Sequence, residues 1–297
     1  MNASSVFSEQ ERFCVRAVLF AILGAFGLIL NVLAVRAIPK CDKIVDFTKL
    51  LMIMQCVLNI LGILPKLLHS PLELWSGQPV ISEGFLRRLL GGLIIFSLYS
   101  SFALQTCTAF TRMIVFRQCS TESLSAKHGK LICVGCAIYG AFFYAIVMQP
   151  CCTFQFDLAT ARYRYMGSNM GLVASVTLLN DLITFPTMVV CYTRALIGID
   201  SLRQTAATSE TISWSEVQYE IRVLLQFLII SSVWAVHVGF FRSLQFKLIR
   251  VEMEYVALVS EFNRYIFLCI DPIIYALFLQ QMRQKIFLFS QNVVSPA

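Results

Sequence analysis

Residues 15–37 read VRAVLFAILGAFGLILNVLAVRA, an apolar run whose charges, Arg16 and Arg36, stand next to its two ends. A helix needs about 20 mostly apolar residues to cross the hydrocarbon core of a bilayer. A helix in a soluble core normally turns a polar face to water, and this run offers none. We therefore predict that residues 15–37 cross a membrane.

Six further runs of the same kind follow along the chain. Hydrophobic residues make up 58% of the 297 residues, charged residues only 14%, and the mean hydropathy is +0.73, which a soluble fold could not hide. We therefore predict an all-α membrane protein, a seven-transmembrane helix bundle that forms one domain over residues 1–297, with a tail at 1–14, the bundle at 15–279 and a second tail at 280–297. The six further spans are 46–68, 89–111, 130–150, 169–195, 221–242 and 253–279.

The charges between the spans indicate how the chain is oriented. Lys and Arg are slightly more numerous in the segments that lie inside when the N-terminus lies outside, as the positive-inside rule expects. No small-residue cleavage site follows the first run, so we predict no cleaved signal peptide. Asn2 opens an Asn-Ala-Ser glycosylation sequon in the extracellular tail. The net charge of +7 is scattered, which argues against nucleic acid as a partner.

Most of the 11 cysteines lie inside apolar spans, where small residues pack well. Cys14, Cys151 and Cys152 fall on the predicted outer side, where a disulfide can form. Cys152 can pair with Cys14 or with Cys151, or stay free. Cys133 and Cys136 form a CxxC inside the fourth span without a second pair, so we predict no metal site there.

Each span carries few polar residues, and such residues usually face the interior of a helix bundle. They are therefore the first candidates for a functional site. They are Asn31, Asn59, Asn180, Asp181, His237, Glu261, Asn263, Arg264 and Asp271.

Four marks in this order resemble the rhodopsin-like G-protein-coupled receptors. Asn31 in GLILNVLAV corresponds to the helix-1 Asn of that family and Asn59 to its helix-2 polar site. Arg112 in FTRMIVF corresponds to the Arg of the helix-3 (D/E)RY motif, and residues 271–275, DPIIY, to the helix-7 (N/D)PxxY motif. The resemblance implies a non-enzymatic receptor in the plasma membrane that binds an extracellular small molecule or peptide and activates a heterotrimeric G protein.

The family normally has Asp in helix 2 and Asn in helix 7, and this chain has the reverse. The exchange keeps one carboxylate, so we expect Asp271 to be satisfied by Asn31, Asn59 and water rather than to face lipid. Pro272 then loosens the seventh helix where activation requires a bend, and Tyr275 completes this activation network.

Thr111 replaces the acid that precedes Arg112 in the family, so a local ion pair is absent. We expect Arg112, at the G-protein coupling surface, to pair with Glu216 or Glu220 at the inner end of the sixth span. The alternative is that both glutamates are solvated surface charges.

The resemblance also bears on the ligand. Ile94 stands where amine receptors carry their ammonium-binding Asp, and residues 253–279 contain no lysine for a retinal Schiff base, so no cofactor is expected. Glu261 and Arg264 are three apart on a helix in the outer half of the seventh span and can pair. With Asp181 and His237 they are the predicted ligand-binding wall; the alternative is that each is satisfied by a neighbouring helix.

Three smaller features also bear on the resemblance, and one of them is a departure from the family. In FLQQMRQKIFLF, Phe278, Met282 and Ile286 share one face, which predicts a short interfacial helix after the seventh span, with a fraying tail as the alternative. Arg87 stands where the family has the cysteine tied to its second outer loop. The opening of that loop, CCTFQFD at 151–157, is similar to nematode chemosensory serpentine receptors of class X, which implies a sensory-neuron membrane, with the sensory cilium as the expected site.

Two other classes of function could use the same polar residues. Intramembrane Asp181, Glu261 and Asp271 could line the path of an ion- or proton-coupled transporter or channel, but the spans show no inverted repeat. A heptahelical zinc hydrolase needs clustered ligands, and the three histidines are scattered along the sequence.

Overall fold

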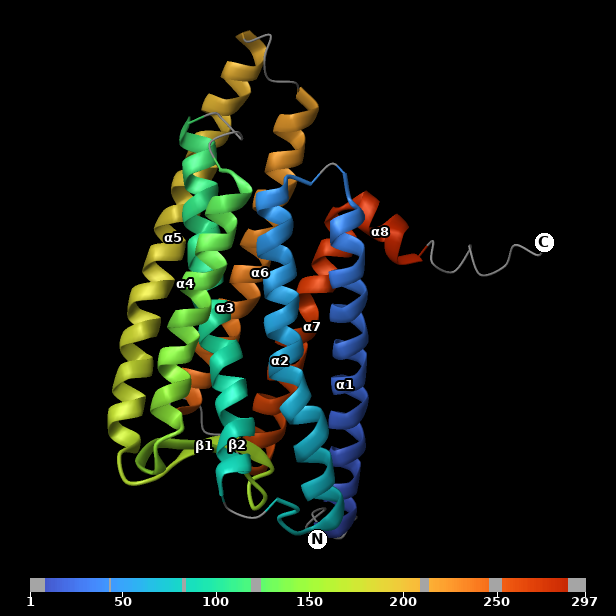
Figure 1. The fold of residues 1–297 in the computed structure, drawn as a ribbon, viewed down its shortest axis with the longest axis vertical. Helices are drawn as coiled ribbons and strands as arrows, with labels where there is room; N and C mark the ends of the chain where they lie inside the picture. Colours follow the sequence, from blue (N-terminus) through green and yellow to red (C-terminus); the bar gives the residue numbers. More distant parts are fainter. Residues whose placement is uncertain are drawn as a thin grey trace, which may run out of the picture.

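The structure, a computed structural model, describes residues 9–42, 44–81, 84–118, 124–208, 214–245 and 253–287. Seven long helices stand side by side and an eighth, short helix turns away from them (Figure 1). The long helices are α1 (Glu9–Ala37), α2 (Asp46–Ser76), α3 (Phe85–Gln118), α4 (Ala126–Val147), α5 (Met170–Thr208), α6 (Trp214–Gln245) and α7 (Met253–Phe278), and the short one is α8 (Gln280–Phe287). Short 3-10 turns, η2 (Ile38–Lys40) and η3 (Pro150–Cys152), follow α1 and α4.

The seven-helix bundle predicted from the sequence is confirmed. Within the described residues, α1 to α6 are long and apolar enough to cross a membrane. Helix α7 packs against α1, α2 and α6, and it carries Glu261, Arg264 and Asp271. Large apolar side chains such as Leu131, Val236 and Ile197 are exposed on the outer faces, as expected where a helix contacts lipid.

The bundle has two different ends (Figure 1). The start of α1 and a β-hairpin lie at one end, which we call the hairpin end. Helix α8 lies at the other, the α8 end, beyond which α5 and α6 project. Met282 of α8 is fully buried, whereas Arg283 and Lys285 are exposed, so the predicted short helix turns Met282 inward; the side chain of Ile286 lies outside the described residues.

The hairpin was not predicted from the sequence. Strands β1 (Thr153–Asp157) and β2 (Arg162–Met166) pair antiparallel, with Phe154 opposite Tyr165 and Phe156 opposite Tyr163. Because side chains alternate along a strand, these four aromatic residues share one face. The hairpin packs against α3 so closely that a side chain at Gly91 would meet the carbonyl oxygen of Phe154.

Several helices extend past the predicted span limits, because a membrane span marks only the apolar part of a helix, whereas α4 ends at Val147, before the predicted limit at 150. Helix α1 begins at Glu9, inside the segment predicted as a tail, and α2 continues past 68 to Ser76. Helix α6 begins at Trp214, seven residues before the predicted span at 221–242. Asn2 lies outside the described residues.

Candidate functional site

A buried polar cluster lies between α1, α2, α3 and α7, and we call it the mid-bundle cluster. The amide of Asn59 donates to Asp271 Oδ2 at 2.8 Å and to Asn31 Oδ1 at 3.2 Å. Asn31 in turn donates to the carbonyl oxygens of Gly27 and Leu268, at 2.8 and 2.9 Å. The structure therefore brings together the side chains of Asn31, Asn59 and Asp271, which are distant in sequence.

Gln55 and Ser101 extend this cluster. Gln55 Nε2 donates to Asn59 Oδ1 at 3.1 Å and to Ser101 Oγ at 3.2 Å. Pro272 and Tyr275 follow on α7, and Tyr275 is fully buried next to Phe227 of α6. These partners stabilise a carboxylate that would otherwise be costly at this depth.

Closer to the α8 end, a buried ion pair joins α3 to α6. Arg112 Nη1 donates to Glu220 Oε2 at 2.7 Å, and Nη2 donates to Thr48 Oγ1 of α2 at 2.7 Å. The Arg112 guanidinium also lies 5.6 Å from the centre of the Phe227 ring. Of the two candidate partners, Glu220 is the one in contact; the side chain of Glu216 lies outside the described residues.

At the hairpin end, Glu261 of α7 is the centre of a second buried network. Its Oε2 accepts from Lys66 of α2, and its Oε1 accepts from Arg264 Nη1 at 3.1 Å and from the backbone N–H of Tyr163 at 3.2 Å. Glu261 therefore ties α2, α7 and strand β2 together. Burial raises the pKa of the Tyr163 phenol, so that hydroxyl stays protonated at neutral pH.

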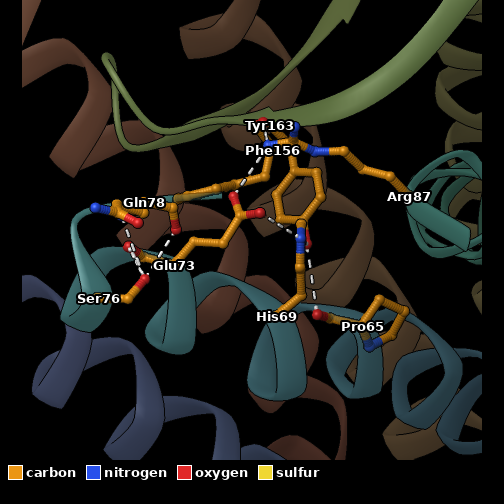
Figure 2. Close-up of polar contacts among 8 residues, drawn as sticks. All are labelled: Pro65, His69, Glu73, Ser76, Gln78, Arg87, Phe156 and Tyr163. Carbon is orange, nitrogen blue, oxygen red and sulfur yellow. Dashed lines mark hydrogen bonds and ion pairs between the residues drawn. The ribbon is translucent and has the colours of Figure 1, made fainter. Parts of the chain in front are cut away.

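A third network, which we call the hairpin anchor, is formed by His69 and Glu73 of α2 and Arg87 of α3 (Figure 2). Arg87 Nη2 donates to Glu73 Oε2 at 3.0 Å and to the carbonyl oxygen of Phe156 at 2.9 Å. His69 lies between Glu73 Oε1, at 3.0 Å from Nε2, and the Tyr163 hydroxyl, at 3.3 Å from Nδ1. Arg87 thus holds the hairpin by a charge-assisted hydrogen bond at the position where a cysteine was expected from the resemblance.

A cavity lies beneath the hairpin, and we call it the hairpin cavity. Asp181 of α5, His237 and Arg242 of α6, and Arg264 of α7 line it together with Phe154 and Tyr165 of the hairpin. Three of the four predicted ligand-binding residues, Asp181, His237 and Arg264, therefore meet at one cavity. The fourth, Glu261, lies beside Arg264. Burial raises the pKa of Tyr165 to about 12, so its phenol is a neutral group at physiological pH.

Asp181 and His237 differ in their surroundings. Asp181 Oδ2 pairs with Arg242, at 2.7 Å from Nε and 2.6 Å from Nη2, and its Oδ1 accepts from Asn180 at 3.1 Å. The His237 ring stacks on Phe267 with centroids 5.5 Å apart. Its Nδ1 is buried and has no hydrogen-bond partner among the described residues.

The predicted outer cysteines form no disulfide in the described part of the chain. Cys14 is a free cysteine, and the sulfurs of the adjacent Cys151 and Cys152 lie 2.8 Å apart. The described residues also contain no group of three His, Cys, Asp or Glu side chains placed to hold a metal ion.

Sequence reasoning missed Lys66 and Glu73, and it assigned Arg87 no contact. All three stand at or beyond the predicted edges of the second and third spans, where a charge is normally solvated. The available signal was the spacing of His69 and Glu73, which are four apart and so share a face if the helix continues. That the hairpin covers them could not be predicted from this spacing.

The arrangement is that of a heptahelical membrane protein with buried polar networks between its helices, and its fold is the rhodopsin fold. No protein-family model and no curated protein matches the sequence. Solved structures do match, among them squid rhodopsin, with a TM-score of 0.78 over 96% of this chain and 87% of that chain. The two sequences are 11% identical, so the likeness shows the fold alone.

Proposed function

We propose that the protein is a G-protein-coupled receptor that binds an extracellular ligand at the hairpin end and activates a heterotrimeric G protein at the α8 end. The observation that carries the proposal is the buried ion pair between Arg112 and Glu220. It joins two helices near the end of the bundle opposite to the cavity, where a signal would have to leave the molecule.

The chemistry of this pair suits a two-state device. Two buried charges are stable while paired, and separating them is costly unless new partners replace them. A G protein that offers such partners to Arg112 would favour a state in which α6 has moved away from α3. The mid-bundle cluster, with Pro272 beside Asp271, gives α7 a polar contact that such a movement would rearrange.

A receptor of this kind also has an expected location, orientation and ligand. The chain lies in the plasma membrane, contacts lipid through its outer faces, and has its N-terminus and the sequon at Asn2 outside. Its ligand is a small molecule or peptide held near Asp181, His237, Glu261 and Arg264. The resemblance to nematode chemosensory receptors makes the sensory cilium the expected site and an environmental chemical the expected stimulus.

Guanine-nucleotide exchange on co-expressed G proteins tests the proposal. Membranes carrying the intact protein should exchange nucleotide faster than membranes without it when pooled odorants or peptides are added. Arg112→Ala should remove the increase. Arg117→Ala is the matched control, because Arg117 is an exposed arginine at the end of the same helix and should leave the exchange unchanged.

Two results would count against a receptor. One is equal exchange by the intact protein and Arg112→Ala across the whole ligand set. The other is ion or proton flux through liposomes without any effect on G proteins, which would favour a transporter. Asp181 and Glu261 already pair with Arg242, Lys66 and Arg264, so they are poorly suited to carry protons.

A further inference from the structure

The hairpin cavity has a distinct charge pattern. Two guanidinium groups, Arg242 and Arg264, line it, against one carboxylate, Asp181. The other carboxylate nearby, Glu261, is bonded to Arg264 and does not line the cavity. The charge of a suitable ligand depends on which of these groups can form a further hydrogen bond or ion pair.

The carboxylates have little such capacity. Both oxygens of Asp181 accept hydrogen bonds, from Arg242 and from Asn180. Both oxygens of Glu261 also accept, from Lys66 on one side and from Arg264 and a backbone N–H on the other. A cationic ligand would therefore have to break a buried ion pair, which is costly.

The guanidinium groups differ from the carboxylates in this respect. Each carries five N–H donors in a rigid fork, so an arginine that pairs with one carboxylate can hold a second anion. The Arg264 guanidinium is fixed at the cavity wall, 5.8 Å from the centre of the Phe154 ring. Its Nη1 donates to Glu261 Oε1, which fixes the orientation of the guanidinium.

His237 gives independent support for a ligand. Its Nδ1 is buried at the cavity without a hydrogen-bond partner among the described residues, although the ring is held by stacking on Phe267. A buried polar atom left unpaired costs free energy, and a ligand oxygen can remove that cost. With the ring proton on Nδ1, the neutral imidazole donates to a carboxylate in the same cavity as Arg264.

The size and lining of the cavity limit the rest of the ligand. Its volume is about 50 Å³, room for about four water molecules. The other walls are largely apolar or aromatic and include Ile95, Leu98, Phe102 and Val238. A short apolar chain fits these walls, and a large or highly polar molecule does not.

We infer that the hairpin cavity binds a short-chain carboxylate, whose anionic head contacts Arg264 and His237 and whose apolar tail lies against Leu98 and Phe102. The inference deepens the proposed function by naming the ligand class, and as a signalling ligand it rests on that function. Binding itself can be measured without a G protein.

The first test is thermal unfolding of the purified protein in detergent with butyrate, butyramide or butylamine, at matched ionic strength with sodium chloride. These three probes have nearly the same size and differ in charge. Butyrate at millimolar concentration should raise the unfolding temperature, and the neutral and cationic probes should not. A shift with butylamine or butyramide equal to or larger than that with butyrate, or no shift with butyrate, would overturn the inference.

Variants then locate the site. Arg264→Gln should weaken butyrate binding at least tenfold. Arg164→Gln, which removes an exposed arginine of the hairpin, should leave butyrate binding unchanged. Because Arg264→Gln also disturbs Glu261, Leu98→Phe is a second variant that keeps every charge. It should shift the preferred chain to a shorter carboxylate. Unchanged affinity in Arg264→Gln together with unchanged chain preference in Leu98→Phe would show that butyrate binds elsewhere.

Failure of this inference is distinguishable from failure of the proposed function. If butyrate binds but no G protein responds, the site stands and the receptor proposal fails. If exchange rises with amines or peptides and butyrate does not bind, the receptor proposal stands and the ligand class is wrong.

Discussion

Arg112 makes its ion pair with another helix and not with its own. With Thr111 in place of an acid, the arginine has no carboxylate beside it on α3, and it pairs instead with Glu220 of α6. An ion pair within one helix restrains only a side chain, whereas this one restrains two helices. The pair therefore couples the position of α6 to the partners of one carboxylate.

Replacing Glu220 by Gln is expected to raise basal nucleotide exchange several-fold without ligand. The change leaves Arg112 with a weaker, neutral partner, and loss of a buried ion pair costs the paired state on the order of 3 kcal/mol. Exchange in membranes at equal receptor density measures the effect. Glu216→Gln is the control, since Glu220 is the glutamate that bonds Arg112, and equal increases in both variants would contradict this assignment.

The pair of Asn59 and Asp271 offers a second test at the scale of residues. Asn59→Asp places two carboxylates where an amide now donates at 2.8 Å, so we expect a loss of roughly 2–4 kcal/mol in stability from like-charge repulsion. Adding Asp271→Asn restores one carboxylate and one amide, and should recover most of the loss. Thermal unfolding of both single variants and the double variant measures the coupling.

Asp271→Asn alone is the control in that cycle, because an Asn side chain keeps an acceptor oxygen for Asn59. It should destabilise much less than Asn59→Asp. If the double variant is as unstable as Asn59→Asp, the two side chains do not act as one unit.

These residue positions show what a sequence can predict. Asn31, Asn59 and Asp271 are polar groups in the middle of long apolar runs, so their burial inside the bundle could be predicted, and their meeting was expected from the resemblance. Lys66 and Glu73 stand at the end of a run, where burial depends on what covers the helix end. That cover is a hairpin whose position depends on contacts distant in sequence, and no local pattern shows them.

At the scale of elements, hydrogen bonds with charged side chains hold the hairpin on the bundle, and the described residues contain no disulfide that does so. Arg87 reaches from α3 to the carbonyl of Phe156 and to Glu73 of α2, and Glu261 accepts from the N–H of Tyr163. Gly91 lets α3 approach the strand. Arg87 and Gly91 therefore join the hairpin to α3, Glu261 joins it to α7, and the Tyr163 hydroxyl contacts His69 of α2, so the hairpin connects these three helices.

Arg87→Leu should therefore release the hairpin. It leaves the Glu73 carboxylate buried without its cation and the Phe156 carbonyl without a donor, and we expect a loss of about 3–5 kcal/mol. Thermal unfolding and the rate of proteolytic cleavage at the hairpin turn, 158–161, measure it. Arg88→Leu is the control, because Arg88 is the adjacent arginine and is only half-buried. Its described side-chain hydrogen bond is to the carbonyl oxygen of Met148, just after α4, at 3.3 Å.

A double variant separates charge from packing in this anchor. Glu73→Leu added to Arg87→Leu removes the orphaned carboxylate, so it should recover part of the lost stability. If instead the two losses simply add, Arg87 acts through packing of its side chain and not through the ion pair.

At the scale of the whole molecule, the two ends of the bundle carry different chemistry. The hairpin end has a covered cavity with buried charges, and the α8 end has the Arg112 ion pair and an amphipathic helix. An aromatic contact extends from the cavity wall into α6, since Phe102 contacts Trp234 with ring centroids 3.8 Å apart. A receptor requires that the cavity face the outside, and the slight excess of Lys and Arg on the predicted inner side is a weak determinant of this orientation.

Chemical labelling of two new cysteines tests the orientation. Arg164 on the hairpin and Lys285 on α8 are both exposed and lie at opposite ends, so each can carry a label without disturbing the core. A membrane-impermeant maleimide should label Arg164→Cys on intact cells and Lys285→Cys only after permeabilisation, each compared with the parent protein to subtract its own cysteines. The reverse pattern would place the cavity inside the cell. An extracellular ligand could then not reach Arg264 directly, and the receptor proposal would lose its physical basis even though the fold, the cavity and the ion pairs were unchanged.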